Sequence, residues 1–306
     1  MTKHIDSASN SRIAAAVKAI ASGETMLLEG RRMIEEAFDA GVWVEEVFVQ
    51  RNQAKESEVR EEEDLLRRVR GEGGSRARTS PSPARVTEVS ARVLRKLSDL
   101  PSTRGLVAMA APPRRTLASL SSLVSPYSPS EKTASSNISR RAAPAGLRGS
   151  ETEGPLFLLL DDVQDPANVG AILRSGEAFG AAGAVLTPGC AWPFSPRALR
   201  ASAGSAFRLP VAASVAAGEA VAWARRHGIA LAGAAAHGGT APEALGSLRP
   251  LVLVIGSEGH GISAEIARSL DHCVTLPLAG RVDSLNAAVA AGVLLHILTR
   301  PPASAR

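Results

Sequence analysis

Cysteine is scarce in this chain, and no long apolar run is present. Among 306 residues there are two cysteines, Cys190 and Cys273, in no Cys-x-x-C or Cys/His spacing, so neither a metal cluster nor a disulfide framework is expected. The six histidines show no HExxH or comparable ligand spacing. No apolar stretch reaches the roughly 20 residues of a membrane span, and the polar start lacks the apolar core of a signal peptide. We therefore expect a cytoplasmic protein without metal or membrane.

Lysine is absent beyond Lys132, which argues against a P-loop phosphate site in the second half of the chain. The glycine-rich stretch 256–261 follows an apolar run, but a P-loop ends on a lysine that reaches the phosphates. Its glycines are spaced GxxGxG rather than GxGxxG, so a nucleotide-dependent oxidoreductase is disfavoured. The stretch does offer backbone groups for a planar heterocycle and one carboxylate, Glu258. A purely structural turn is the alternative interpretation.

Positive charge is concentrated in the first half of the chain. The formal net charge is +5, yet residues 151–306 carry 11 arginines, no lysine and 12 acidic residues. The preceding 150 residues hold 24 basic and 18 acidic residues. The asymmetry favours a polyanionic partner held by the first half, although an ordinary solvated surface explains the charge equally well.

Hydropathy predicts two α/β domains joined by a linker. Residues 1–112 form the first domain and residues 155–306 the second. Residues 113–154 are rich in Ser, Pro, Ala and Arg with few large apolar side chains, and predict a flexible linker. Residues 71–83 predict a second flexible excursion. The predicted strands are 25–28, 44–49, 86–89, 106–109, 156–160, 184–186, 229–232, 251–255 and 274–277, and the predicted helices are 11–21, 29–41, 55–70, 90–97, 198–206, 216–226 and 284–299, with one or two helical turns at 117–124.

The start of the second domain organises the rest of it. The unbroken apolar run 156–160 is typical of a parallel strand that is buried on both faces. An Asp-Pro turn follows, then Asn168, which can cap a helix that ends at Gly180, and a second apolar run after Gly183. The pattern predicts a βαβ unit with a polar loop at the carboxyl end of its first strand, where open α/β sheets bind ligands.

Polar residues follow three predicted strands of this domain: Asn168 and Arg174, then Glu258, then Ser284 and Asn286. Polar groups that converge from the carboxyl ends of separate strands are typical of an α/β active site. Each has a structural alternative: Asn168 and Ser284 as helix caps, Glu258 as a helix-dipole partner, and Arg174 as a surface residue. Taken together, the five residues favour an active site.

Three segments, 168–174, 255–261 and 276–286, resemble in order and spacing the three motifs of the SpoU (TrmH) branch of the SPOUT RNA 2′-O-ribose methyltransferases. In the first domain, Leu28-Glu-Gly-Arg-Arg and Leu97-Ser-Asp through Gly105 resemble the L30e-like substrate-binding domain of rRNA-modifying members. The resemblance implies a trefoil-knotted catalytic domain, with a parallel sheet flanked by helices, behind a small α/β RNA-binding domain.

The resemblance also implies a set of site residues. Arg174 would be the central catalytic residue, oriented together with ribose and cofactor by Asn168, Glu258, Ser284 and Asn286. Homodimerisation through the catalytic domain is implied as well. The implied S-adenosyl-L-methionine site consists of Ile255, Gly256, Glu258, Gly259, Leu276, Leu278, Ser284 and Leu285, and the implied RNA contacts are Arg31, Arg32 and Arg104, the last at a position where family members often carry glutamine.

These implications predict an S-adenosyl-L-methionine-dependent RNA 2′-O-ribose methyltransferase that acts on 23S-type ribosomal RNA. A tRNA methyltransferase and an inactive RNA-binding or assembly factor of the same fold are the alternatives. The presence of all five motif residues weighs against inactivity. Because the pKa of an arginine exceeds about 12, we expect Arg174 to hold the adjacent phosphate and the nascent alkoxide while an RNA phosphate or water takes the proton.

Overall fold

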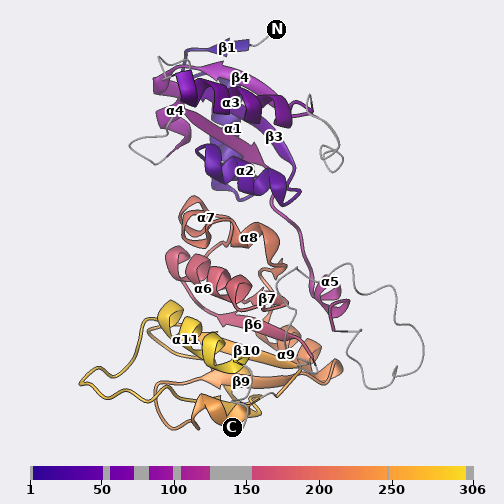
Figure 1. Ribbon diagram of the computed structural model, residues 1–306, viewed down its shortest axis with the longest axis vertical. Helices are drawn as coiled ribbons and strands as arrows, with labels where there is room; N and C mark the ends of the chain where they lie inside the picture. The colour runs from indigo at the N-terminus through magenta and orange to yellow at the C-terminus, as the bar shows by residue number, and fades with distance from the viewer. Residues whose placement is uncertain are drawn as a thin grey trace. The chain divides into compact units, whose positions relative to one another are not determined.

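The computed structural model describes residues 3–50, 56–71, 83–98, 105–124, 154–246 and 248–300. It divides into two compact units, residues 1–113 with 194–207 and residues 114–193 with 208–306. Each unit is built on its own β-sheet (Figure 1). Nearly all of the predicted excursion 71–83 and most of the predicted linker lie outside the described residues. In the described part of the chain, no helix is long and apolar enough to span a membrane.

The first unit is a five-stranded mixed sheet with helices that pack against it. Helix α1 (Ser11–Ala21) and helix α4 (Ala91–Leu97) bury Ile13, Val93 and Leu94 against Phe48 of the sheet. Helices α2 (Arg31–Asp39) and α3 (Glu56–Val69) also belong to this unit. The sheet order is β1 (Lys3–Ile5), β4 (Arg85–Val89), β3 (Val44–Gln50), β5 (Leu106–Ala110) and β2 (Met26–Glu29).

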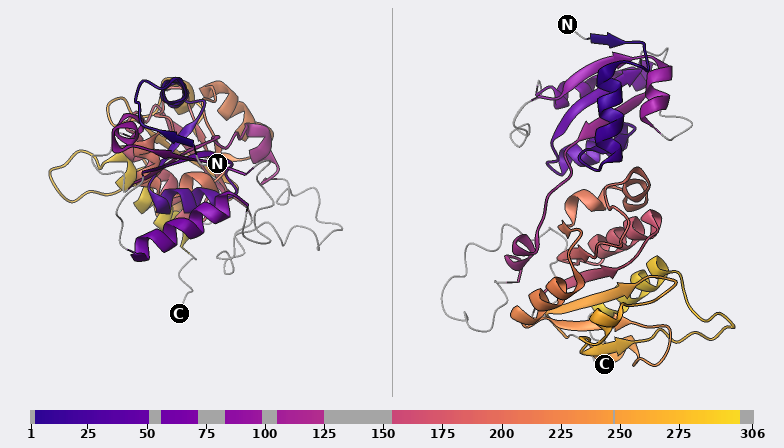
Figure 2. Two further views of the ribbon diagram at one scale, coloured as in Figure 1. Left: turned by 90° about the horizontal axis from the view of Figure 1, so that it is seen from above. Right: turned by 180° about the vertical axis from the view of Figure 1, so that it is seen from behind.

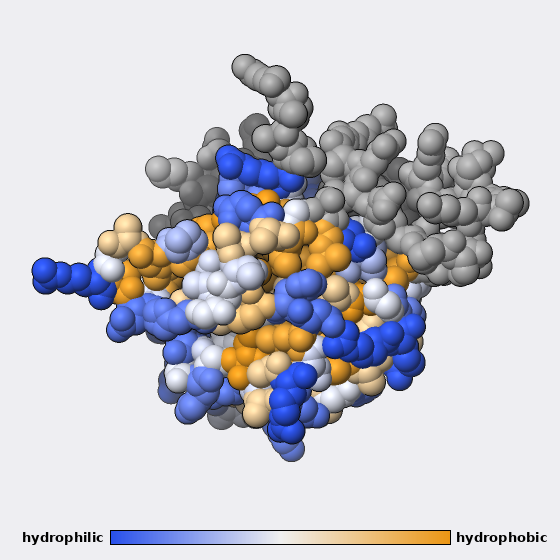
Figure 3. Space-filling view, turned by 90° about the horizontal axis from the view of Figure 1, so that it is seen from below, coloured by the Kyte–Doolittle hydropathy of each residue, from blue (hydrophilic) through white to orange (hydrophobic). Residues whose placement is uncertain are grey.

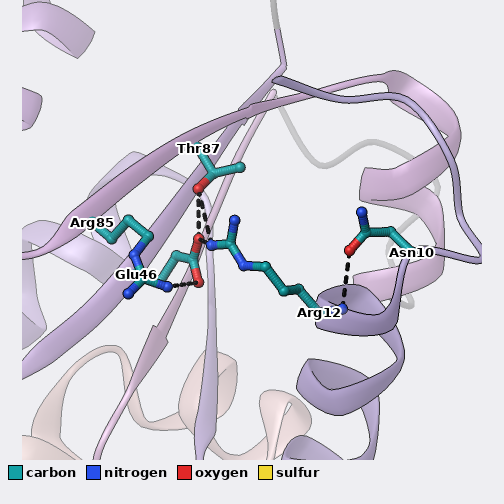
Figure 4. Close-up of polar contacts among 5 residues, drawn as sticks. All are labelled: Asn10, Arg12, Glu46, Arg85 and Thr87. Carbon is teal, nitrogen blue, oxygen red and sulfur yellow. Dashed lines mark hydrogen bonds and ion pairs between the residues drawn. The ribbon is translucent and has the colours of Figure 1, made fainter. Parts of the chain in front are cut away.

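A polar cluster ties α1 to this sheet (Figure 4). The carboxylate of Glu46 accepts hydrogen bonds from the Arg12 guanidinium and, at 2.5 Å, from Thr87 Oγ1, and Arg85 Nη1 lies 3.8 Å from its second oxygen. Asn10 caps α1 by accepting from the amide of Arg12 at 2.9 Å. The Glu46 side chain is only 14% exposed, so its charge needs these partners. Arg12 is therefore engaged in holding α1 on the sheet.

The second unit is a six-stranded sheet in which every neighbouring pair is parallel. Helix α6 (Pro166–Ala178) connects β6 to β7, which are adjacent, so the predicted βαβ unit is confirmed. Parallel pairing explains the unbroken apolar runs, because every residue of β6 and β7 is buried. The sheet order is β11 (His272–Val274), β9 (Ala230–Ala234), β10 (Leu251–Gly256), β6 (Leu156–Asp161), β7 (Gly183–Leu186) and β8 (Val211–Ala212).

Helices flank this sheet, and α6 lies beside the last helix, α11 (Ala287–Thr299) (Figure 1). Helix α9 (Ala217–Arg226) packs Trp223 against Phe157 of β6, ring edge to ring face. Short helical segments fill the connections. In the second unit they are the 3-10 helix η5 (Pro242–Leu245) and α10 (Ala264–Ala267), whereas α7 (Pro196–Ser202) and most of α8 (Ser205–Arg208) belong to the first unit.

The stretch 114–124, inside the predicted flexible linker, is part of the second unit. It contains α5 (Leu117–Ser121), and three of its four large apolar residues are buried in the same core cluster as Phe157 and Trp223. The predicted start of the linker at residue 113 is therefore wrong, because 114–124 belongs to the second unit. Four apolar residues among serines are too few to predict burial, but they suffice to cover the edge of an existing core. Leu117, Leu120 and Val124 are buried, and Leu123 is partly buried against them.

Ser121 is expected to stabilise this attachment. Its Oγ accepts from Trp223 Nε1 at 3.0 Å and lies 2.9 Å from His227 Nε2. Ser121→Ala leaves the buried indole N–H without its acceptor, so we expect the free energy of unfolding to fall by about 1–3 kcal/mol in urea denaturation. Ser122→Ala, at an exposed neighbour, is the control and should change it by less than about 0.5 kcal/mol. Equal effects of the two variants would contradict this role.

Candidate active site

The three motif segments meet at one edge of the second sheet. Strands β6, β10 and β11 run parallel, so the segments that follow them, 162–165, 257–263 and 275–286, leave the sheet at the same edge. The longest of these, 275–286, leads into α11 and extends away from the sheet (Figure 2). Topology alone therefore brings the predicted polar residues into one region.

Asn168 is the centre of the polar contacts in this region. The cap of α6 is Asp165, whose Oδ1 accepts from the amide of Ala167 at 2.9 Å, so the alternative that Asn168 is the helix cap is wrong. Asn168 lies inside the first turn and is only 9% exposed. Its Nδ2 donates to Glu258 Oε1, and its Oδ1 accepts from Asn286 Nδ2 at 3.0 Å. One residue from each motif thus joins a single chain of hydrogen bonds.

Chemistry fixes the direction of this chain of bonds. An ionised carboxylate can only accept, so Asn168 must present its N–H₂ group to Glu258. Its carbonyl oxygen is then turned toward Asn286. Asn286 in turn accepts, through Oδ1, from the amides of Ala288 at 3.0 Å and Val289 at 3.3 Å. The network therefore links α6, the turn after β10 and the first turn of α11.

Glu258 stands on a tight turn that two glycines make possible. Ser257 and Gly261 exchange both backbone hydrogen bonds, at 3.0 and 2.9 Å. A Cβ on Gly256 would lie 2.2 Å from the carbonyl carbon of Gly261, and Gly261 itself has φ +67°. Gly259 has no such constraint, since a Cβ there would meet no atom within 4 Å. The backbone of the turn thus requires glycine at 256 and 261, whereas the space beside Gly259 is open.

Asn286, and not Ser284, caps α11. The helix begins at Ala287, three residues later than predicted, so the alternative that Ser284 is a cap is wrong. Ser284 is exposed and makes no hydrogen bond within the described residues. Asn286 does act as a cap through its oxygen, while its nitrogen binds Asn168. The structural and functional interpretations of Asn286 are therefore compatible.

Helices α6 and α11 run parallel from this network. Beyond the contact of Asn168 with Asn286, a Cβ on Gly292 would lie 3.5 Å from Ser175 Oγ. Further along, the rings of Phe179 and His296 lie 5.6 Å apart. His296 thus packs between helices and is not near the polar cluster.

Arg174 lies apart from this network. It is exposed on α6 and makes no ion pair or hydrogen bond to any residue that the structure describes. Six residues advance about 600° around a helix, so Arg174 points about 120° away from Asn168. Its assignment as the central catalytic residue remains a prediction, and the same holds for Ser284.

The predicted cofactor residues lie around the turn and the loop that follows β11. Ile255 is buried at the end of β10, Gly256 ends that strand, and Leu278 is 36% exposed. Within the described residues, the backbone N–H groups of Leu276, Leu278 and Leu285 donate no hydrogen bond. These donors therefore have no hydrogen-bond acceptor among the residues that the structure describes.

Cys190 has a structural environment. Its Sγ lies 3.2 Å from the carbonyl oxygen of Leu160 and 3.8 Å from Thr187 Oγ1. Burial raises the pKa of the Cys190 thiol, so it stays protonated and can donate to Leu160. No group of three potential metal ligands occurs among the residues that the structure describes.

In the first unit, two of the three predicted RNA contacts are placed. Arg31 and Arg32 are exposed in the first turn of α2, behind Gly30 at φ +82°. Arg31 Nη1 lies 3.3 Å from the Glu35 carboxylate one turn later. Arg104 lies outside the described residues.

Two family profiles match separate parts of the chain. The profile described as SpoU rRNA Methylase family matches residues 155–296, and the profile described as MRM3-like substrate binding domain matches residues 21–108. A protein of Mycobacterium ulcerans named an uncharacterized tRNA/rRNA methyltransferase is 41% identical over 151 residues, which cover 49% of this chain and 48% of that protein. The chain thus spans about half the length of the curated relatives it matches.

Solved structures resemble the chain over most of its length. The SpoU methyltransferase AviRb from Streptomyces viridochromogenes, in complex with the cofactor AdoMet, is 25% identical and covers 95% of this chain and 98% of its own, with a TM-score of 0.70. An RNA 2′-O ribose methyltransferase is 27% identical and covers 96% and 97%, with a TM-score of 0.66. Residues 155–296, which contain the parallel sheet and the three converging loops, thus match the SpoU rRNA Methylase family.

Proposed function

We propose that this protein is an S-adenosyl-L-methionine-dependent methyltransferase that methylates a ribose 2′-OH of RNA, with ribosomal RNA of the 23S type as substrate. The observation that carries the proposal is the hydrogen-bonded chain from Asn286 through Asn168 to Glu258, which joins all three motif loops. Two similar structures, one with AdoMet bound and one of an RNA 2′-O ribose methyltransferase, support it.

The loops of the site fit the adenosine part of this cofactor. Free backbone donors at Leu276, Leu278 and Leu285 can bind ring nitrogens and ribose hydroxyls, and Gly259 leaves room above the turn. Together with Ile255, Gly256, Glu258 and Ser284 these residues would hold it. When bound, the cofactor's sulfonium supplies the methyl group for in-line displacement by the ribose oxygen.

The side chains of the site then orient the reacting groups and stabilise the developing charge. Asn168 fixes the carboxylate of Glu258, and Asn286 fixes Asn168, so neither amide has to reorganise during the reaction. The guanidinium of Arg174 holds the neighbouring phosphate and the charge that develops on the ribose oxygen. The proton leaves to an RNA phosphate or to water.

The first unit favours ribosomal over transfer RNA as the substrate. Its match to a substrate-binding domain and the exposed Arg31 and Arg32 support a role in gripping RNA phosphates. A tRNA substrate is the second candidate, favoured by the tRNA/rRNA wording in the names of relatives. We place the reaction in the cytoplasm, where either RNA is available.

We further propose a trefoil knot in the second unit. The segment 235–240 wraps around the end of β11, because Ala235 N donates to Val274 O and Thr240 N donates to Cys273 O, both at 2.9 Å. Thr240 O also accepts from Thr275 N at 3.0 Å. The chain after β11 then continues to α11 beside α6. A loop closed around a later segment is the arrangement that a knot requires.

We propose that the second unit forms a homodimer through α11. Val289 and Val293, one turn apart on this helix, are 53% and 40% exposed, and apolar side chains gather on the surface of the second unit seen from below (Figure 3). Paired exposed valines favour a protein contact. Light scattering should give the mass of two chains for the wild type and of one chain for Val289→Glu/Val293→Glu, because two carboxylates cannot be buried unpaired.

Ala222→Glu, on the exposed face of α9, is the control and should remain dimeric. A wild-type protein with the mass of one chain, or a double variant that stays dimeric, would contradict a dimer through α11.

Methyl transfer can be tested directly with purified protein. Incubation with methyl-tritiated S-adenosyl-L-methionine and separate rRNA and tRNA pools should label the rRNA, and alkaline hydrolysis should leave the label in dinucleotides, since a 2′-O-methyl blocks cleavage. Label in mononucleotides would mean base methylation. Cofactor binding without label in either pool would favour the inactive RNA-binding factor.

A further inference from the structure

Asp161 ends strand β6 and is buried, although sequence reasoning did not single it out. It is 3% exposed and stands in register with Gly256, the last residue of the adjacent strand β10. A buried carboxylate is costly unless hydrogen bonds compensate for its lost hydration. An acidic residue at the end of an otherwise apolar strand is the signal that could have identified it.

The compensating bond comes from the far side of the glycine turn. The amide of Ser263 donates to Asp161 Oδ2 at 2.7 Å. Ser263 precedes α10, and its own side chain does not cap that helix. The chain thus enters the turn at Gly256, opposite Asp161, and returns at Ser263 to bind Asp161. Both ends of the turn are fixed to the end of β6.

The part of the turn between these ends carries the site. Ser257 and Gly261 close it by their two backbone bonds, which leaves Glu258 at its tip facing Asn168. Within the described residues, the backbone of 258–260 makes no hydrogen bond to the sheet. A shift of Ser263 would therefore also move Glu258 and Gly259.

We infer that Asp161 is a positioning residue for S-adenosyl-L-methionine binding, acting through the turn 256–261 without touching cofactor or RNA. The inference rests on the proposed function for the identity of the ligand. The Asp161 carboxylate holds Ser263, Ser263 sets the exit of the turn, and the turn sets the carboxylate of Glu258 and the open space at Gly259.

Asp161→Ala and Asp161→Asn separate this role from a general structural one. Hydrogen exchange on the protein without ligand should show the amides of 257–263 exchanging about tenfold faster in Asp161→Ala. By calorimetry its dissociation constant for S-adenosyl-L-methionine should rise about tenfold, while kcat at saturating cofactor stays within about threefold. Asp161→Asn keeps an oxygen acceptor for Ser263, so both values should return to within about threefold of the wild type.

Asp162→Asn is the matched control. Asp162 is adjacent but binds Gln164 within its own loop, and asparagine tolerates its φ of +55°. It should leave exchange and binding unchanged. If Asp161→Ala does not fold, Ser263→Pro removes the donor instead, and the φ of −58° at Ser263 suits proline.

Unchanged exchange and binding in Asp161→Ala, or in Ser263→Pro where that variant replaces it, would overturn the inference while the proposed function stands. A wild-type protein that binds no S-adenosyl-L-methionine would refute the proposed function instead. In that case exchange at 257–263 still tests whether Asp161 holds the turn.

Discussion

Arg174→Ala is expected to lower the rate of methyl transfer by about 10²–10³-fold at saturating S-adenosyl-L-methionine, the usual loss when one donor to a developing oxyanion is removed. The dissociation constant of the cofactor should stay unchanged, because Arg174 is exposed on α6 and makes no hydrogen bond with Asn168, Glu258 or Asn286. Its exposure also means that the free energy of unfolding should change by less than about 0.5 kcal/mol. Single-turnover assays and calorimetry measure the two quantities.

Arg226→Ala offers a matched control, because Arg226 is an exposed arginine at the end of α9. It should keep wild-type rates. Arg174→Lys keeps the charge but loses the planar fork, so an intermediate rate is expected. An Arg174→Ala enzyme with near wild-type turnover would refute the role proposed for this residue.

Gly256→Ala should lower both stability and cofactor binding, whereas Gly259→Ala should weaken cofactor binding alone. A Cβ on Gly256 would approach the backbone of Gly261 to 2.2 Å, and backbone cannot yield as a flexible side chain does. The turn must move, so we expect about 1–3 kcal/mol lower stability and cofactor binding weakened by about 100-fold or more. Gly259→Ala meets no atom of the chain and should unfold like the wild type.

Cofactor binding to Gly259→Ala therefore tests whether adenosine occupies the open space at Gly259. If adenosine occupies the open space, the added methyl group weakens binding by about tenfold with no change in stability. Thermal unfolding and calorimetry on the same samples separate the two effects. A Gly256→Ala protein that binds the cofactor like the wild type would show that the turn does not form the site.

The parts of the fold that sequence predicted are those whose residues carry strong local signals. The runs at β6 and β10 are long and wholly apolar, and α1 was predicted at its observed bounds, Ser11–Ala21. Strands β1 and β8 were missed, because three and two residues show no periodicity. They are strands because an existing sheet edge pairs with them.

Other errors come from backbone conformations that composition does not reveal. The predicted helix 198–206 is two helices, since Ala203 at φ +47° and Gly204 at φ +86° break it. The predicted strand 274–277 lies at His272–Val274, because proline at 277 cannot donate to a ladder and pairing with β9 ends earlier.

The sequence predicts which residues form the candidate site but not how they contact one another. Strand ends and motif spacing indicated Asn168, Glu258 and Asn286, and the structure brings these three together. That Asp165 caps α6, which leaves Asn168 for tertiary contacts, depends on helix geometry rather than composition. Arg174 is likewise separated from the network because it points about 120° around the helix axis away from Asn168.

The most direct test of the account is mass spectrometry of nucleosides from rRNA and tRNA of cells with and without this protein. We expect one 2′-O-methylated nucleotide to disappear from the large-subunit rRNA when the protein is absent, and to return with the wild type but not with Arg174→Ala. A methyl group lost from tRNA would keep the chemistry and change the substrate. Unchanged 2′-O-methylation in both pools, with the cofactor still bound by the purified protein, would contradict a methyltransferase role.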